Sequence, residues 1–487
     1  MKIVIDNKYL TIKDFDRDVL KFINKHFKVQ KTGSGFTRQA GVMVYNAQRV
    51  KKINLYDYDP DTNSLIFLNG AWDFLKNKKQ FKKILEEKKP KIIDKRELIS
   101  FDNFTDDEIK NVFKDYGVVL RDMQIKFFKE FPLKKQRNIL VEAPTGSGKT
   151  ILFLAILKLL NIPAIITGKE KQNVNKNYKV AIEKLGFSKK ETGFFTNAKY
   201  TQKKKYQFCT IGMINKIPNL EDYKLLIVDE VHEASSNTYQ KFFIEKCNVP
   251  VFGFSGTPLK KQKEHKMKLL QVFGDVWELD KTDNLIEKDE LAIPIFILYE
   301  NFDDDVFEEF QEAYTNLANE IITKGIVNNK SRNKKAVNLA SNLYKKGEKV
   351  LILTQRVEHG EFIVEKLNEK LNLKTQFISG KDKIEKRDEE MNKFEQAEGQ
   401  ALLVMSSIGD VGMDLPTMNH LIILSSGKAE WLVKQRLGRA LRKTKNKEKK
   451  YIHDFLDTEH KILQKWSEER INVYKKIKNG KVKIIHL

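Results

Sequence analysis

The segment Asn138–Thr150, NILVEAPTGSGKT, constrains the fold of this chain more than any other stretch. Its apolar start predicts a buried strand, a glycine-rich turn follows, and the apolar segment 151–160 predicts a helix. A strand, a glycine loop and a helix in this order are the setting that a phosphate-binding loop requires. Backbone N–H groups of such a loop, with the positive end of the helix dipole, hold phosphate oxygens. The alternative is a plain turn before a core helix, which does not explain why Lys149 and Thr150 follow the glycine loop.

This loop predicts a site for ATP with Mg²⁺. We expect Lys149 to contact the β- and γ-phosphates, and the hydroxyl of Thr150 to hold the metal. The other residues expected to line the nucleotide are Ala143, Pro144, Thr145, Gly146, Ser147 and Gly148. Ala143 stands where the general pattern has glycine, so the loop is a variant of that pattern.

Two adjacent carboxylates form the second strong signal. In the run LLIVDEVH, which covers 225–232, an apolar strand ends in Asp229 and Glu230. Ligands bind at the C-terminal ends of strands in open α/β sheets. We expect Asp229 to hold Mg²⁺ through water, and Glu230 to orient and activate an attacking water.

Strands alternate with helices from Leu120 onward, a pattern typical of parallel α/β sheets. The first series of predicted strands covers 139–142, 164–167, 208–211, 225–228 and 251–254. After a charged stretch at about 270–345, which we expect to be mostly helical, a second series covers 350–354, 375–378, 401–405, 421–425 and 451–455. Two series predict two similar doubly wound domains with a cleft between them. We expect these domains to span 101–285 and 286–457, followed by a basic helix and tail at 458–487.

Residues 1–100 differ in pattern and predict a small α+β domain. Helices are expected at 14–27 and 71–88, and strand-like runs occur at 42–45, 53–58 and 64–68. The basic glycine loop 31–38 carries Phe36 and Arg38, which we expect to contact nucleic acid; a solvated hairpin tip is the alternative. The domain could also serve only stability or protein interaction.

Charge favours a polyanionic partner. The chain has 89 Lys and Arg against 66 Asp and Glu, a formal net charge of +23. Nucleic acid is the first candidate and a membrane surface the second, although lysine is scattered along the whole chain. No apolar run approaches the ~20 residues of a membrane span, and the N-terminus lacks a signal-peptide pattern. The two cysteines form no CxxC pair, which argues against disulfide scaffolds and zinc ribbons. We expect a cytoplasmic protein, in the host cytoplasm if it is viral.

With these elements in view, residues 120–455 resemble the superfamily 2 helicases, in the DEAD/DEAH-like group that carries Asp-Glu-x-His. The resemblance implies two tandem RecA-like domains. It also implies that the motor needs only residues 120–455, so that a chain starting near Lys110 keeps its ATPase activity. The resemblance gives His232 a place in the catalytic site. It implies that Arg121 and Gln124, in LRDMQ, contact the nucleotide, with Gln124 reading adenine. Ser255-Gly256-Thr257-Pro258 resembles the motif that couples ATP hydrolysis to movement. The implied nucleic-acid contacts in the first domain are Thr167, Lys169 and Thr210, although the family's proline after the threonine is absent here.

Motifs of the second domain follow in the family's order. Arg356, in the segment that opens this domain, and Ser406 are the implied nucleic-acid contacts. Gly412 and Asp414 are implied to face the nucleotide. In QRLGRALR the family resemblance implies catalytic roles for Gln435, Arg439 and Arg442. The two arginines lie one helical turn apart on one face, and we expect them to act as arginine fingers on the γ-phosphate.

The domain layout is similar to phage UvsW-type DNA helicases and to relatives of the XPB type. That similarity implies an ATP-dependent helicase or translocase that acts on forks, Holliday junctions and R-loops in replication, recombination and repair. We expect it to work as a monomer, with replication or recombination proteins as candidate partners. An RNA helicase, an ATP-switched clamp that does not travel, and the motor subunit of a restriction or repair complex remain alternatives.

Overall fold

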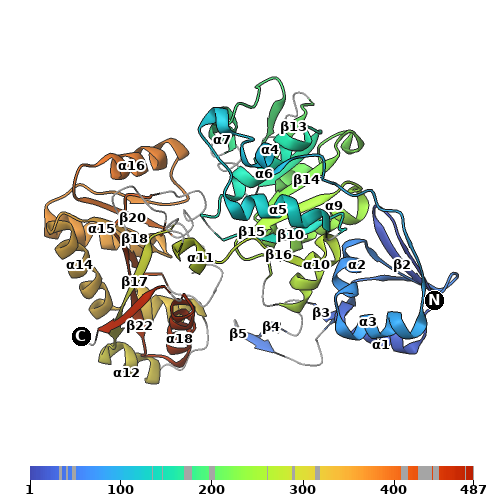
Figure 1. The fold of residues 1–487 in the computed structure, drawn as a ribbon. Coiled ribbons are helices and arrows are strands. Elements are labelled where there is room, and N and C mark those ends of the chain that lie inside the picture. The colour runs from blue at the N-terminus through green and yellow to red at the C-terminus, as the bar shows by residue number, and fades with distance from the viewer. Residues whose placement is uncertain are drawn as a thin grey trace. The chain divides into compact units, whose positions relative to one another are not determined.

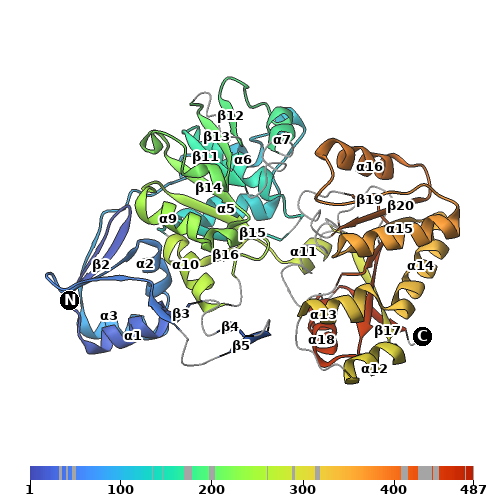
Figure 2. The same cartoon turned by 180° about the vertical axis from the view of Figure 1, so that it is seen from behind.

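The computed structural model describes residues 1–31, 36–39, 42–45, 51–133, 135–144, 146–168, 178–196, 203–259, 262–287, 291–312, 318–406, 415–425, 441, 449–477 and 479–485. They form two compact units, Met1–Asp280 and Lys281–Leu487. Figure 1 and Figure 2 show the fold from opposite sides. The first unit holds a small N-terminal domain and one parallel sheet, and the second unit holds another parallel sheet.

The described part of the N-terminal domain is built on a five-stranded sheet of order β7-β8-β2-β1-β9. These strands are β1 (Lys2–Ile5), β2 (Tyr9–Lys13), β7 (Asp57–Asp59), β8 (Ser64–Leu68) and β9 (Lys91–Asp94). Its helices are α1 (Arg17–Phe27), α2 (Gly70–Lys76) and α3 (Lys79–Lys88). Two short hairpins pair β3 (Lys28–Gln30) with β6 (Lys52–Asn54), and β4 (Phe36–Gln39) with β5 (Val42–Tyr45).

Local sequence explains helix α1. The side chain of Asp16 caps its start by accepting hydrogen bonds from the N–H groups of Asp18 and Val19. Its apolar face is buried, as the periodicity predicts. The helix expected over 71–88 is two helices, because α2 ends at Lys76, and Asn77 donates its side-chain amide to the Asp73 carbonyl.

The N-terminal domain shares its core with the domain that follows. Helix α2 packs against α10 (Lys263–Phe273), and buried side chains of both belong to one continuous apolar cluster. At Gly70 a Cβ would lie only 2.4 Å from the Val272 carbonyl oxygen, so only glycine permits this approach. The buried Asn138 amide donates both to Asn69 Oδ1, at 2.9 Å, and to the Val272 carbonyl, at 2.7 Å. A chain that starts near Lys110 would lose part of this core, which argues against the prediction that it keeps its ATPase activity.

The first parallel sheet has the strand order β12-β13-β11-β14-β15-β10-β16, seven strands among the described residues. Its strands are β10 (Ile139–Glu142), β11 (Ala164–Gly168), β12 (Thr192–Phe195), β13 (Tyr206–Thr210), β14 (Leu225–Asp229), β15 (Val251–Ser255) and β16 (Val276–Glu278). The helices around it are α4 (Asp106–Lys110), α5 (Asp122–Leu133), α6 (Lys149–Leu160), α7 (Lys179–Lys184), α8 (Ile211–Ile214), α9 (Asn237–Glu245) and α10. All five strands expected here are present; β12 and β16 were not predicted.

The second parallel sheet has the order β19-β20-β18-β21-β22-β17-β23, again seven strands among the described residues. Its strands are β17 (Ile293–Asn301), β18 (Lys349–Thr354), β19 (Phe377–Ile378), β20 (Ala401–Ser406), β21 (His420–Ile423), β22 (Lys449–Asp457) and β23 (Lys481–Ile485). Its helices are α11 (Thr282–Glu287), α12 (Asp304–Glu312), α13 (Ala318–Ile322), α14 (Lys330–Lys345), α15 (Val357–Leu371), α16 (Ile384–Gln396) and α18 (Lys461–Lys475), with a π-helical turn at Thr323–Val327. Together the sheets confirm the expected pair of doubly wound parallel domains.

Two segments of the second unit differ from expectation. The stretch 270–345, expected to be mostly helical, contains β17, which lies between β22 and β23 inside the sheet. The segment 458–487, expected as a basic helix and tail, supplies α18 and the strand β23 that pairs with β17. In the part of the chain that the structure describes, no helix is both long and apolar enough to cross a bilayer.

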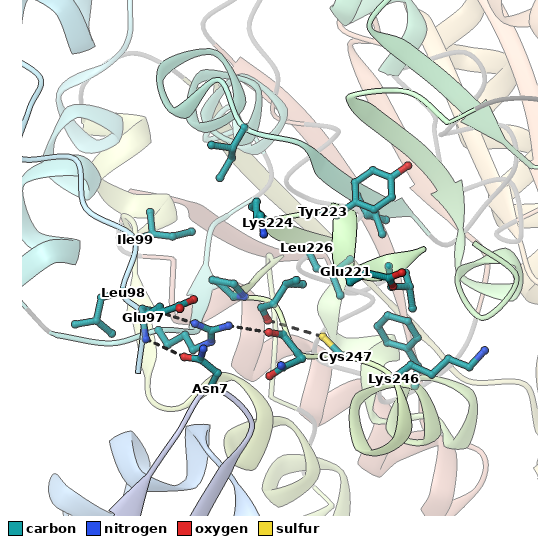
Figure 3. Close-up of a pocket in the computed structure, with 18 residues that line it drawn as sticks. Asn7, Glu97, Leu98, Ile99, Glu221, Tyr223, Lys224, Leu226, Lys246 and Cys247 are labelled. Carbon is teal, nitrogen blue, oxygen red and sulfur yellow. Dashed lines mark hydrogen bonds between the residues drawn. The ribbon is translucent and has the colours of Figure 1, made fainter. Parts of the chain in front are cut away.

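A cavity of about 510 Å³ lies at the amino-terminal ends of the first sheet's strands (Figure 3). Asn7 of the N-terminal domain and the connector around Glu97 line one side, and Tyr223 and Lys246 of the parallel-sheet domain line the other. The buried Arg137 donates to the Glu97 and Asn248 carbonyl oxygens at 2.7 and 2.8 Å, which ties the connector to the domain. Ligands of open α/β sheets bind at the opposite edge, at the C-terminal ends of the strands.

Candidate active site

The predicted catalytic elements meet at three neighbouring strand ends. Strands β14, β15 and β10 are adjacent in the sheet, and the register places Glu142 beside Ser255 and Asp229 beside Phe254. The glycine loop follows β10, and the paired carboxylates end β14. Parallel strands thus bring the loop and the carboxylates to one edge, with Ser255 between them.

Backbone conformation shapes the loop. Gly146 and Gly148 have φ angles of 90° and 76°, in the left-handed region that favours glycine. A Cβ at Gly148 would also lie 2.6 Å from the Gln124 side-chain nitrogen. Helix α6 begins directly after Gly148, so Lys149 and Thr150 occupy its first turn, and Ala143 and Pro144 lead into the loop from β10.

Arg121 and Gln124 hold this loop from the side. Arg121 Nη1 donates to the Gly146 carbonyl at 2.8 Å, and Gln124 Nε2 donates to the Gly148 carbonyl at 3.1 Å. Gln124 is only 2% exposed, and its Oε1 accepts the backbone N–H of Arg121. Both residues predicted to bind the nucleotide thus lie against the phosphate-loop backbone, whereas the adenine contact of Gln124 stays a prediction.

The loop fits a phosphate group chemically. The hydroxyl of Ser147 is fully buried, and among the described residues it has no hydrogen-bond partner. Buried polar groups normally have a partner, and a loop N-terminal to a helix offers the donors that a phosphate needs. Thr150 and Asp229 add the hydroxyl and carboxylate oxygens that Mg²⁺ takes beside phosphate oxygens.

Lys149 and Glu230 form an ion pair at 3.2 Å. Burial raises the pKa of Glu230, but the Lys149 ammonium and the His232 ring outweigh this effect and hold it below its ordinary value. Burial and the Glu230 charge instead raise the pKa of Asp229. Glu230 has a φ of 51°, an uncommon conformation for a residue with a side chain, and its backbone N–H donates to Asp229 Oδ1 at 3.0 Å.

His232 links the carboxylates to Ser255. Its Nδ1 lies 3.0 Å from Ser255 Oγ and 3.3 Å from Glu230 Oε2, and its Nε2 lies 3.3 Å from Glu233 Oε1. Burial lowers the pKa of His232, but the carboxylates of Glu230 and Glu233 raise it above the ordinary value overall. The Ser255 hydroxyl also receives the backbone N–H of Thr257 at 3.2 Å. The segment that resembles a coupling motif therefore contacts the Glu230 carboxylate through Ser255.

Tyr178 is a site residue that the sequence analysis missed. Its hydroxyl donates to Asp229 Oδ2 at 2.6 Å. It lies outside every motif, so only its aromatic character next to helix α7 could have drawn attention to it.

Two residues expected to contact nucleic acid in this domain lie at neighbouring strand ends. Strands β11 and β13 pair so that Thr167 faces Cys209 and Gly168 faces Thr210. The side chain of Thr167 is 0% exposed and shares a hydrogen bond of 2.8 Å with the Tyr239 hydroxyl. A side-chain contact of Thr167 with nucleic acid would require this buried bond to open.

In the second sheet, Thr354 of β18 faces Ser406 of β20 at the C-terminal edge. Ser406 is fully buried, and its hydroxyl has no hydrogen-bond partner among the described residues. Arg356 follows β18 and donates to Asn319 Oδ1 at 3.0 Å. Arg356 and Ser406, the two residues of this domain predicted to contact nucleic acid, thus lie at the ends of neighbouring strands.

Some predicted site residues lie outside the described residues: Thr145, Lys169, Gly412, Asp414, Gln435, Arg439 and Arg442. Phe36 and Arg38 lie on β4, which is described by its backbone alone. Their roles stay predictions.

The fold and this edge define a class of protein: a nucleotide-driven motor with two parallel-sheet domains, the first carrying a phosphate loop and paired carboxylates. Two family profiles match the chain. The family described as type III restriction enzyme, res subunit, matches residues 117–260, and the helicase conserved C-terminal domain matches 333–444. The chain belongs to the superfamily 2 helicases, of the UvsW and XPB type.

Curated relatives are distant but consistent. A protein named as a helicase from Sulfolobus islandicus filamentous virus is 24% identical over 386 residues, covering 71% of this chain and 65% of the relative. The ATP-dependent DNA helicase uvsW of Enterobacteria phage T4 is 24% identical over 53% of this chain and 55% of its own length. The DNA 3'-5' translocase XPB2 of Sulfurisphaera tokodaii is 24% identical, over 68% and 80%. The chain thus spans less than two thirds of the first two relatives.

Solved structures share the fold. Mss116p bound to ssRNA and AMP-PNP matches with a TM-score of 0.53 and 15% identity, over 80% of each chain. The ATP-dependent type ISP restriction-modification enzyme LlaBIII bound to DNA matches with a TM-score of 0.52 and 14% identity, over 84% of this chain and 34% of its own. At this identity the likeness concerns the fold alone.

Proposed function

We propose that this chain is a DNA helicase or translocase that uses ATP and Mg²⁺ to unwind or branch-migrate branched DNA, including forks, Holliday junctions and R-loops. The observation that supports its ATP chemistry best is the cluster of Lys149, Glu230 and Asp229 at the edge where the glycine loop ends. Hydrolysis of the terminal phosphoanhydride of ATP, bound with Mg²⁺, supplies the driving energy.

Each residue of this cluster has a defined task. Lys149 contacts the terminal phosphates, while Thr150 and Asp229 hold the metal. Glu230 stays ionised near neutral pH because its pKa is held low, so its carboxylate can accept a hydrogen bond from a water and orient that water for attack. Arg439 and Arg442 complete this proposal as cationic groups that stabilise the charge of the transition state.

The Ser255 contact offers a route from hydrolysis to movement. Glu230 Oε2 accepts a hydrogen bond from Ser255 Oγ at 3.3 Å, and Ser255 starts the segment 255–258. If the Glu230 carboxylate exchanges its hydrogen bond with Ser255 for another partner, the hydrogen bonding of that segment changes. In this proposal the segment passes the nucleotide state to the strand ends that grip nucleic acid.

Support for DNA comes from charge and from relatives. The net charge of +23 suits a phosphate backbone. Two relatives carry the names DNA helicase and DNA translocase. Contacts to the backbone carry no sequence information, so binding should tolerate any sequence and weaken strongly with salt.

RNA is the second candidate substrate. One relative, from Acanthamoeba polyphaga mimivirus and 23% identical, is named as an RNA helicase. An ATP-switched clamp that does not travel would use the same nucleotide site.

A panel of substrates tests the proposal. ATPase stimulation and strand separation are measured on forks, four-way junctions, plain duplex, single strands and RNA hybrids of matched length, with the Lys149→Ala variant as the background. We expect the largest responses with forks and junctions. Equal or larger responses with RNA would favour the RNA helicase. A separate assay follows the displacement of a third strand from a blocked triplex; ATPase stimulation without this displacement would favour the clamp.

A further inference from the structure

The carboxylate of Asp229 is held on both oxygens by donors of the protein. Its Oδ1 accepts the backbone N–H of Glu230 at 3.0 Å, and its Oδ2 accepts the hydroxyl of Tyr178 at 2.6 Å. The second bond is the shorter, and it comes from a side chain outside the helicase motifs. A carboxylate held from two directions has little freedom to rotate.

Tyr178 is itself closely packed. It is 2% exposed, and its ring makes an edge-on contact with Phe153, with centroids 5.5 Å apart and planes at 87°. On another side it lies against Phe208, with centroids 5.6 Å apart. Phe153 belongs to helix α6, whose first turn carries Lys149 and Thr150. The helix that presents the phosphate-binding lysine therefore also supports the tyrosine that holds the carboxylate.

We infer that Tyr178 is a positioning residue for the metal: its hydroxyl fixes the Asp229 carboxylate in the orientation that receives Mg²⁺ with the nucleotide. This inference rests on the proposed role of Asp229. Groups that hydrogen-bond a metal-binding carboxylate orient it, and their loss commonly lowers metal affinity by about 10-fold or more. The tyrosine needs no contact with nucleotide or water to act in this way.

A purely structural hydrogen bond is the competing explanation. The same domain contains a matched case: Tyr239 is also buried, and its hydroxyl bonds to Thr167 rather than to Asp229. Tyr178→Phe and Tyr239→Phe both remove one buried hydroxyl and keep the ring. An effect shared by both variants reflects lost stability, and an effect of Tyr178→Phe alone on metal use reflects positioning.

The test uses the full chain and a fluorescent ATP analogue. The affinity of the chain for the analogue is first measured in EDTA, without free metal. Mg²⁺ is then titrated, and the half-point is the Mg²⁺ concentration at which half of the metal-dependent gain in affinity is reached. For Tyr178→Phe we expect unchanged binding in EDTA and a half-point raised about 10-fold. In ATPase assays, kcat at saturating Mg²⁺ should stay within a few-fold of the native value. Tyr239→Phe should leave the Mg²⁺ half-point unchanged.

An Asp229→Asn variant distinguishes a failure of the metal role proposed for Asp229 from a failure of the positioning role inferred for Tyr178. If Asp229→Asn removes the metal-dependent tightening while Tyr178→Phe shows the native Mg²⁺ half-point, the positioning role is wrong and the proposed site stands. If Asp229→Asn responds to Mg²⁺ like the native chain, the proposed metal role of Asp229 fails, and the inference about Tyr178 fails with it. A lowered half-point for Tyr178→Phe would also overturn the inference, because it would mean that the hydroxyl competes with the metal.

Discussion

The ammonium of Lys149 lies 3.2 Å from the carboxylate of Glu230, with both side chains about five-sixths buried, at 15% and 16% exposure. Lys149 begins helix α6, which follows β10 through the glycine loop, and Glu230 directly follows β14. Strand β15 separates β10 from β14 in the sheet. This contact brings the cation predicted to bind the phosphates next to the carboxylate predicted to activate water.

Lys149→Ala should abolish ATP turnover and leave nucleic-acid affinity largely intact, because the lysine faces the phosphate loop and the carboxylates. Turnover and strand binding are measured on the same preparation. Lys158→Ala is the matched control, since Lys158 lies in the last turn of the same helix, away from the loop. Normal turnover in Lys149→Ala would remove the basis for the phosphate-loop assignment.

Removal of residues 1–109 should yield a destabilised protein without ATPase activity. The truncation exposes the face of α10 that packs on α2 and leaves the buried Asn138 amide without its Asn69 acceptor. Differential scanning fluorimetry and an ATPase assay measure the outcome. A stable, fully active truncated chain would show that the shared core contributes little.

A smaller deletion tests the loop that carries Phe36 and Arg38. The backbone N–H of Lys31 donates to the Lys51 carbonyl at 2.8 Å, so the two ends of the loop are adjacent. Replacing residues 32–50 by Asn-Gly, which favours a tight hairpin turn, keeps the β3–β6 pair and the core. We expect native ATPase activity on single strands and a reduced preference for forks and junctions. An unchanged preference would assign the loop no role in recognising branched DNA.

A buried carboxyl predicts the pH dependence of the second unit. Glu459 is 2% exposed, and its Oε1 accepts the amides of Asn301 and Asn329 at 2.7 and 3.0 Å. Among the described residues, neither Glu459 Oε2 nor Asn301 Oδ1 has a partner. A proton on Oε2 would satisfy both atoms in a reciprocal acid–amide pair. Burial, aided by the charge of Asp457 and opposed by Arg332 and the Asn329 amide, raises the pKa of Glu459 from 4.5 to about 7.

The sign of the effect follows from this direction. The folded chain binds the proton more tightly than the unfolded chain, so the contribution of Glu459 is full below pH 4.5 and is lost as pH rises through about 7. The melting temperature of the second unit should therefore fall between pH 5 and pH 8. Glu459→Gln, whose amide donates like the protonated acid, should flatten that slope and raise the melting temperature at pH 8. An unchanged slope would mean that Glu459 does not titrate in this range.

Sequence patterns predicted the parts of the fold and site where one physical signal dominates. Apolar runs such as 139–142 and 225–228 can only be buried strands when a loop and charged residues follow. The glycines of the phosphate loop are needed for their positive φ angles, so the place of the loop could be predicted from the sequence. Both sheets of the motor and the edge that carries Lys149 and Glu230 were predictable for these reasons.

The remaining features depend on contacts between distant segments. Strand β17 was missed because charged, helix-like sequence surrounds Ile293–Asn301, although its apolar run was a usable signal. The contact of Tyr178 with Asp229 joins residues 51 positions apart and belongs to no motif. The shared core of the N-terminal domain depends on the approach of Gly70 to Val272, which no local pattern announces.

Single-turnover hydrolysis by Glu230→Gln tests the central claim most directly. With the enzyme in excess over labelled ATP, both ATP affinity and the rate of the chemical step are measured in the presence of a DNA fork. We expect native or tighter binding of ATP with Mg²⁺, because Lys149, Thr150 and Asp229 remain, and a chemical step slower by about 10²–10⁴-fold. Hydrolysis within a few-fold of the native rate, or loss of ATP binding as in Lys149→Ala, would contradict the role of Glu230 as the residue that activates water.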